Sequence, residues 1–252
     1  MKFKCDLEIP YYDCNKYGDV TATAILKYLG ETSLKHSDYI GWNFDRLVSR
    51  GYGWILNRWK VEIKDYPKAR ERITIETWTS RFYKFYANRE FIIYDSNNNI
   101  IGKASTVWIF MNIKKGRPDR IPQDIYKDYD LIDERLFVDF DNFKEDISID
   151  RSLDFRTRRS DIDYNNHVNN VKYLDWILEV VPEEVYKDYI LREFEILYKQ
   201  EVKYGDILKS QIGEGSKLDN SIEFIHRVQD KSSKSIRTFA KTIWKKNKDI
   251  EV

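Results

Sequence analysis

The chain has 252 residues, enough for one large domain or for two of ordinary size. Its 43 basic and 42 acidic residues leave a formal net charge of +1, so no global field favours nucleic acid or an anionic membrane as a partner. Hydrophobic residues make up 42% and aromatic residues 15% of the sequence, which allows a large core and favours strands. No run approaches the ~20 apolar residues that a membrane span requires.

The first residues and the cysteines indicate a cytoplasmic protein. Residues 1–6 lack the apolar stretch of a signal peptide and the Arg/Ser bias of a transit peptide. Cys5 and Cys14 have no metal-ligand spacing, so we expect reduced thiols, with a single disulfide as the alternative. The three histidines are too scattered to complete a ligand set with them. The sequence therefore predicts no metal centre and no cofactor.

The first half predicts a helix followed by an antiparallel sheet. Apolar residues at helical spacing occupy 21–48, where we expect two helical pieces broken near Gly30. Alternating apolar residues then predict strands at 59–63 and 73–77. A polar turn at 95–99 separates two further strand candidates and indicates a hairpin.

Residues 123–150 separate the two halves. They hold ten acidic and three basic side chains mixed with Leu, Ile and Phe. A flexible Gly/Ser linker has a different composition, so we expect an ordered connector pinned to the surface by its apolar residues. We place an N-terminal domain at 1–125, the connector at 126–150 and a C-terminal domain at 151–252.

The second half repeats the pattern of the first. A helix is predicted from Val171 to Val181, after two asparagines that favour a helix start, and Pro182 should close it. Four segments match between the halves in the same order: 90–92 with 223–225, 104–108 with 240–244, 13–20 with 161–168, and 64–67 with 202–205. Each half is predicted to be an α+β unit, and the chain a duplication.

A polar segment ahead of the second predicted helix can carry chemistry. Asp163, Asn165 and His167 stand at alternate positions, and in an extended segment their side chains would converge on one side. Unpaired N–H groups at the helix start could hold a carbonyl oxygen as it becomes an oxyanion. A carboxylate or imidazole could then handle water. The structural alternative is that these Asp and Asn residues form turns and caps.

The cluster is predicted in the second copy alone. The matching positions of the first half are Asn15, Tyr17 and Asp19, which cannot do the same job. His36 lies in a polar helical context and His226 in a strand, and both are predicted to be structural or solvent-facing.

Segment 161–178, DIDYNNHVNNVKYLDWIL, resembles the active-site segment of the acyl-acyl carrier protein thioesterases, the plant and bacterial enzymes that release fatty acids from their carrier. The resemblance extends to 60–67, 75–78 and 102–108, and so over most of the chain. It implies a tandem double hot-dog fold, in which each half is a curved antiparallel sheet wrapped around a long helix. This α+β architecture agrees with the repeats.

The resemblance assigns catalytic roles to four residues, Asp163, Asn165, His167 and Glu201. Glu201 should lie on the strand after the second helix. Strand alternation alone would place it with Lys199 and Lys203 toward solvent, and its counterpart in the first half is Ile63. Plant members commonly have a cysteine directly after this glutamate. Val202 stands there in this chain, which excludes a cysteine nucleophile.

The resemblance implies hydrolysis of the thioester of fatty acyl-acyl carrier protein, which releases free fatty acid in fatty acid biosynthesis. Glu201 or Asp163 would act as base toward water or attack directly, while Asn165 and His167 orient and polarise. An acyl-coenzyme A thioesterase of the same fold and a non-catalytic acyl-binding protein are the alternatives. The preferred acyl chain length is not readable from the sequence.

The resemblance also implies an acyl-loaded, acidic acyl carrier protein as partner, so its docking surface should be basic. Basic segments lie at 114–120, 156–159 and 245–248, and 156–159 is favoured because it directly precedes the catalytic segment. The first domain would hold the acyl chain, with three tryptophans as its wall or as ordinary core, Trp54, Trp59 and Trp78. The sequence predicts no nucleic acid partner and leaves a homodimer open.

Overall fold

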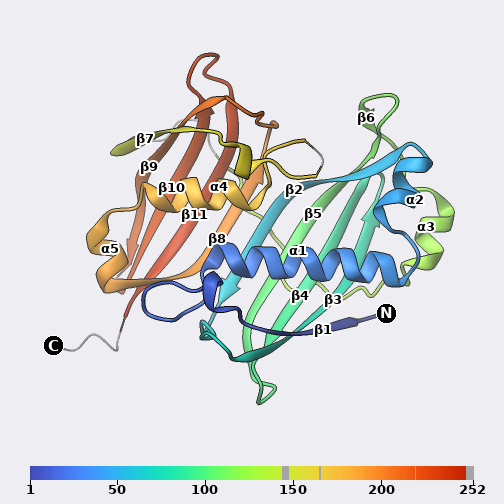
Figure 1. Ribbon diagram of the computed structural model, residues 1–252, viewed down its shortest axis with the longest axis horizontal. Helices are drawn as coiled ribbons and strands as arrows, with labels where there is room; N and C mark the ends of the chain where they lie inside the picture. Colours follow the sequence, from blue (N-terminus) through green and yellow to red (C-terminus); the bar gives the residue numbers. More distant parts are fainter. Residues whose placement is uncertain (144–147, 165, 219, 248–252) are drawn as a thin grey trace. The chain divides into compact units, whose positions relative to one another are not determined.

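The computed structural model describes residues 1–143, 148–164, 166–218 and 220–247. The chain divides into two compact units, Met1–Val138 and Asp139–Val252. In each unit a helix lies across an antiparallel sheet (Figure 1). No helix in the described ranges is long and apolar enough to cross a membrane.

In the N-terminal unit the sheet packs against the long helix α1 (Ala22–Tyr39). Its strand order is β1-β3-β4-β5-β2, with antiparallel neighbours throughout. The strands are β1 (Phe3–Glu8), β2 (Tyr52–Ile63), β3 (Arg72–Tyr83), β4 (Tyr86–Tyr94) and β5 (Ile100–Asn112). The unit also contains a short strand, a 3-10 helix and two further α-helices: β6 (Arg117–Pro118), η1 (Tyr11–Asp13), α2 (Phe44–Ser49) and α3 (Gln123–Asp128).

Helix α1 corrects one prediction. It begins where the hydroxyl of Thr21 accepts the N–H of Ala24, and it runs through Gly30 without a break. The chain turns instead after Tyr39, where Gly41 adopts a φ of 80°. The predicted break near Gly30 is wrong because a glycine inside a helix lowers its stability by about 1 kcal/mol without ending it, whereas a left-handed residue ends it.

The hairpin predicted at 95–99 is confirmed between β4 and β5. One carboxylate oxygen of Asp95 accepts the N–H groups of Asn97 and Asn99, both at 2.8 Å. The Asp95 side chain thus provides acceptors for backbone N–H groups at the tip of the turn, a role that Asp residues commonly have in loops.

The C-terminal unit repeats this plan. Its strand order β7-β9-β10-β11-β8 and the order of its elements along the chain match those of the first unit. The strands are β7 (Arg151–Arg156), β8 (Tyr189–Tyr198), β9 (Ile207–Leu218), β10 (Ser221–Asp230) and β11 (Ile236–Lys246). The helices are α4 (Val171–Glu179) and α5 (Glu183–Asp188). The predicted α+β tandem hot-dog fold is confirmed, and Pro182 precedes α5 after α4 has ended at Glu179.

Strand register refines the repeat. Two successive N–H groups donate to the carbonyl of Ile101 in the first unit and to that of Arg237 in the second, so the match of 104–108 with 240–244 holds. Phe91 faces Ala104 on the neighbouring strand, and His226 faces Ala240. The match of 90–92 with 223–225 is wrong by two residues, because Phe91 corresponds to His226. A shift of two keeps every side chain on the same face of the strand, so the sequence pattern could not reveal it.

Candidate active site

The predicted cluster lies in a tight turn of the C-terminal unit. An isolated bridge between Ile162 and Val168 closes the turn, and Asp163 donates its N–H to the carbonyl of His167 at 2.8 Å. Asn166 has a φ of 62° and donates to the carbonyl of Asp163 at 3.0 Å. The predicted extended segment is therefore wrong. Asp163 and His167 are neighbours because the turn folds the chain back.

Side-chain geometry joins the turn to a second loop. The imidazole Nε2 of His167 lies 3.3 Å from a carboxylate oxygen of Glu201, within ion-pair range when the imidazole is protonated. The two side chains are 43% and 53% exposed. One carboxylate oxygen of Asp163 accepts the N–H of His167 at 3.4 Å. Asn165, the remaining predicted member, lies outside the described residues.

Glu201 lies in the loop between β8 and β9, so its predicted place on a strand is wrong. The strand ends at Tyr198, where the chain leaves the ladder. Val202, the next residue, is fully buried, and its carbonyl accepts the N–H of Val168 at 3.2 Å. This bond ties the Glu201 loop to the turn that holds His167. Val202 thus fixes the backbone while Glu201 remains accessible.

The start of α4 does not offer the predicted oxyanion donors. Val171 donates its N–H to the side-chain oxygen of Asn169 at 3.2 Å, and Lys172 donates to the carbonyl of the same asparagine at 2.9 Å. Tyr173 donates to the carbonyl of Asn170 at 3.4 Å. These amides already have acceptors within the chain, because the asparagines that start the helix also satisfy its first turn.

The two other histidines are structural. His36 and His226 have no exposed surface. Burial, reinforced by the Arg89 guanidinium, lowers the pKa of His36 to about 3, and burial lowers the pKa of His226 to about 3. Each imidazole has a polar neighbour at 2.8 Å, Arg89 for His36 and Thr242 for His226. Both stay neutral at physiological pH, far from the role of an exposed acid or base.

The protein-family model for the acyl-ACP thioesterase N-terminal domain matches residues 1–129 of the sequence. The one for the acyl-ACP thioesterase C-terminal domain matches residues 144–246. The chain belongs to the acyl-ACP thioesterase family. A palmitoyl-acyl carrier protein thioesterase of Cuphea hookeriana is 27% identical over 224 residues. The match covers 83% of this chain and 54% of that protein, so the chain spans about half the length of this relative.

Solved structures of the family share the fold. An acyl-ACP thioesterase from Bacteroides thetaiotaomicron superposes with a TM-score of 0.84 at 24% identity, covering 97% of this chain and 98% of that one. The 12:0-ACP thioesterase from Umbellularia californica gives a TM-score of 0.85 at 20% identity, with 98% and 94% covered. At these identities the structures show the fold alone.

The first unit of this family member contains the same turn without the cluster. A bridge between Cys14 and Val20 closes it, and Asn15 donates its N–H to the carbonyl of Asp19 at 2.8 Å. Gly18 has a φ of 84°, as Asn166 has a positive φ in the second turn. The match of 13–20 with 161–168 is therefore confirmed.

The counterpart of Glu201 is Tyr66 and not Ile63. Val20 donates its N–H to the carbonyl of Pro67 at 2.9 Å, just as Val168 donates to the carbonyl of Val202. Tyr66 directly precedes the acceptor Pro67, and Glu201 directly precedes the acceptor Val202, so the two residues correspond. The match of 64–67 with 202–205 is wrong by three residues, because this backbone contact was invisible in the sequence.

The basic segment before the turn is already partly engaged. Arg158 pairs with the buried carboxylate of Asp161 at 3.2 Å, and the guanidinium of Arg159 lies 4.9 Å from the ring centre of Tyr204. Arg156 is exposed at the end of β7. Arg158 therefore stabilises the turn, which leaves Arg156 and Arg159 as the candidates for contact with a partner.

The three tryptophans have different surroundings in the first unit. Trp59 and Trp78 are buried, and Trp78 donates its indole N–H to the carbonyl of Glu134 at 2.9 Å. Trp54 stacks on Phe82 and packs edge-on against Phe110. Among the described residues, no group of three His, Cys, Asp or Glu side chains could hold a metal ion.

Proposed function

We propose that the protein hydrolyses the thioester of fatty acyl-acyl carrier protein and releases free fatty acid in fatty acid biosynthesis. The observation that carries the proposal is the pair of His167 and Glu201, 3.3 Å apart and about half exposed, beside the turn of Asp163. Membership of the acyl-ACP thioesterase family supports the substrate class. A half-exposed carboxylate next to an imidazole suits proton transfer to and from water.

Glu201 acts as the general base in this proposal. It takes a proton from water, whose oxygen attacks the carbonyl carbon of the thioester. The tetrahedral intermediate then breaks its C–S bond, and the proton held by Glu201 passes to the departing sulfur. The products are the free fatty acid and the carrier thiol.

The remaining predicted residues orient this reaction. His167 can donate from its ring to the carboxylate or to the substrate oxygen, and Asn165 would polarise the carbonyl. Asp163 holds the backbone of His167 through its carboxylate. We assign Asp163 to orientation rather than to base chemistry, because its oxygen already accepts a hydrogen bond within the turn, whereas that of Glu201 faces the imidazole.

The first unit is proposed to hold the acyl chain, with Trp54 as wall material. The turn of the first unit has the same backbone as that of the second but lacks its proposed catalytic side chains. Asp19 stands there in the place of His167 and pairs with Lys68 at 3.1 Å. The division of labour gives binding to 1–125 and chemistry to 151–252.

The proposed partner is acyl carrier protein, an acidic protein, docked near Arg156 and Arg159. Both are exposed and lie close in sequence to the turn of His167. Attraction between exposed charges is screened by salt. The specificity constant for the carrier-bound substrate should therefore fall as salt is added.

The test is incubation with acyl carrier thioesters of graded chain length, with release of free fatty acid as the readout. Replacement of Glu201 by Gln should lower kcat at least ~100-fold with folding unchanged, as expected for loss of a general base. Glu184→Gln, at an exposed glutamate on α5, is the matched control and should leave kcat unchanged.

Three results would contradict the proposal. Full activity of Glu201→Gln would remove the proposed base. Faster turnover of acyl-coenzyme A than of any carrier thioester would favour the coenzyme A enzyme. Binding of acyl carrier thioesters without release of fatty acid would indicate an acyl-binding protein.

A further inference from the structure

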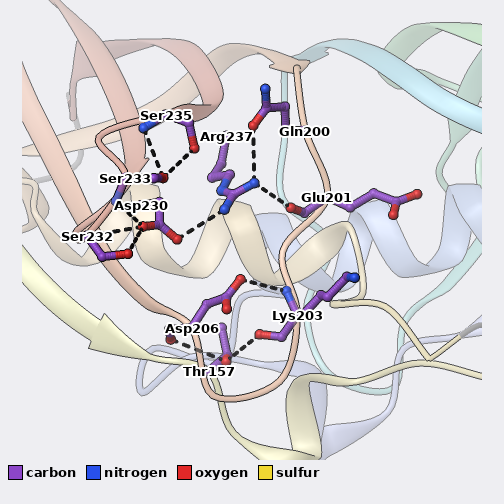
Figure 2. A network of polar contacts seen from close by, with 10 residues as sticks. All are labelled: Thr157, Gln200, Glu201, Lys203, Asp206, Asp230, Ser232, Ser233, Ser235 and Arg237. Carbon is purple, nitrogen blue, oxygen red and sulfur yellow. Dashed lines mark hydrogen bonds and ion pairs between the residues drawn. The ribbon is translucent and has the colours of Figure 1, made fainter.

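The backbone of Glu201 is held in place although its carboxylate is exposed. On one side, Arg237 of β11 donates from Nη1 to the backbone carbonyl of Glu201 and to the side-chain oxygen of Gln200, each at 3.1 Å. Figure 2 shows the carboxylate of Glu201 pointing away from the arginine. Arg237 therefore contacts the main chain of the proposed base and not its reacting atoms.

Arg237 is itself fixed by the turn that follows β10. Its Nη2 donates to a carboxylate oxygen of Asp230 at 3.0 Å, and the two side chains are largely buried. The hydroxyl of Ser232 and the N–H of Ser233 donate to the other oxygen. These hydrogen bonds hold the pKa of Asp230 well below its ordinary range, so the carboxylate keeps its charge. The Nη2 of Arg237 is thus anchored to Asp230, while its Nη1 donates to the loop that carries Glu201.

The other end of the loop is fixed as well. The hydroxyl of the buried Thr157 donates to the carbonyl of Lys203 at 2.8 Å, and Lys203 donates its N–H to Asp206 at 3.0 Å (Figure 2). Together with the bond from Val168 to Val202, these contacts leave little freedom to the main chain after Glu201. Before Glu201, backbone bonds from residues 199 and 200 to the carbonyl of Arg237 restrain the chain, and the Arg237 guanidinium adds a second restraint.

The first unit shows that this backbone path does not need an arginine. There, two successive N–H groups of the loop donate to the carbonyl of Ile101, at 2.8 and 3.1 Å. In the second unit, two successive N–H groups donate to the carbonyl of Arg237, at 2.9 and 3.3 Å. Ile101 thus stands in the place of Arg237, and Tyr66 in that of Glu201. In the second unit Arg237 thus occurs together with the carboxylate of Glu201, whereas in the first unit Ile101 occurs together with Tyr66.

Given the proposed hydrolysis, on which this role rests, we propose that Arg237 is a positioning residue that sets where the Glu201 carboxylate stands relative to His167. It does so by holding the backbone at residues 200 and 201. A planar guanidinium can donate to the loop and to Asp230 at once, whereas the single ammonium of lysine cannot span both. Displacement of a catalytic group by ~1 Å can cost on the order of 100-fold in rate.

The first experiment replaces Arg237 with Lys and measures hydrolysis of acyl carrier thioester. We expect kcat to fall about 10- to 100-fold with KM within about twofold, because the side-chain bonds to residues 200 and 201 are lost while the backbone bonds of the loop and all substrate contacts remain. Arg227→Lys is the matched control, since Arg227 of β10 has a guanidinium that donates to the side chain of Gln211 on β9 at 3.0 Å. It should retain the parent kcat.

The second experiment places Arg237→Lys in the Glu201→Gln background. If Arg237 acts through Glu201, the double variant should be no slower than Glu201→Gln alone. Equal fractional losses in both backgrounds would overturn the positioning role, because they would indicate a general structural effect. Arg237→Ile tests the same point with the residue that the first unit carries, and it should behave as Arg237→Lys.

The two proposals fail separately. A parent-like kcat for Arg237→Lys and Arg237→Ile, with Glu201→Gln inactive, would overturn the role of Arg237 and leave the proposed function standing. A fully active Glu201→Gln would reject the proposed base and the positioning role with it.

Discussion

Adjacent residues in the loop after β8 have opposite environments. The carboxylate of Glu201 is about half exposed beside His167, whereas Val202 is fully buried. The loop leaves the strand at Tyr198 and places these two neighbours in different surroundings. The proposed base and the residue that anchors its backbone are therefore sequence neighbours. Water can reach the first, while the second is packed in the core.

Buried histidines contribute to stability in a pH-dependent way. The unfolded chain binds a proton to each imidazole near pH 6.5, whereas His36 and His226 in the folded protein bind one only near pH 3. Between these values the unfolded state holds more protons, so the free energy of unfolding falls as the pH falls. Below about pH 3 this loss is complete.

A His226→Gln variant should make the protein less sensitive to mild acid. From pH 7.5 to 5.5, each buried histidine should lower the free energy of unfolding by about 1.4 kcal/mol, and the variant lacks one of the two contributions. Urea unfolding at both pH values measures the difference. An equal decline in parent and variant would show that His226 is not buried as a neutral group.

Two glycines, one inside α1 and one just after its end, differ in whether a side chain could replace them. Gly30 lies inside the helix, where an added Cβ would meet no atom within 4 Å. Gly41 has a φ of 80°, and an added Cβ would lie 3.3 Å from the guanidinium of Arg46. The helix therefore tolerates a side chain at the first position and requires glycine at the second.

Alanine at these positions should shift stability in opposite directions. Gly30→Ala should raise the free energy of unfolding by about 0.5–1 kcal/mol, because glycine loses more conformational freedom on folding. Gly41→Ala should lower it by about 1–2 kcal/mol, because an L-residue is strained in the left-handed region. Urea unfolding of the two variants decides the matter, and a stabilised Gly41→Ala would contradict the turn geometry.

At the scale of the whole molecule, the two units contain the same backbone turn, and only the turn of the second unit carries the candidate site. In the first turn the side-chain oxygen of Asn15 accepts the N–H groups of Tyr17 and Asp19, at 2.9 and 3.1 Å. In the second, an oxygen of Asp163 accepts the N–H of His167. An asparagine is therefore compatible with this turn, and the charge of Asp163 is not needed to fold it.

Reciprocal replacements use this likeness. Asp163→Asn should lower kcat at least about 10-fold with an unchanged melting temperature, because the turn keeps its acceptor and loses only the charge beside His167. Asn15→Asp, the matched change in the first unit, should leave kcat within about twofold. Steady-state hydrolysis of acyl carrier thioester compares them. Equal effects in both units would contradict a site confined to the second.

The sequence by itself determined the duplication, the hairpin at 95–99, the helix at α4 and the segment that carries Asp163 and His167. These features follow from local patterns, because turn residues and helical or alternating apolar spacing act over a few neighbours. Even the wrong match of 90–92 kept the correct strand face. The family resemblance added Glu201, whose exposed position gives no periodic signal of its own.

The tertiary structure alone decided how these pieces meet. The contact of His167 with Glu201, the restraint by Arg237 and the equivalence of Tyr66 with Glu201 depend on polar contacts between residues more than 30 positions apart. Such contacts arise from strand register and loop closure, which the alternation of side chains does not specify. The sequence therefore indicated the second copy as the proposed place of chemistry, and the fold decided which side chains stand together there.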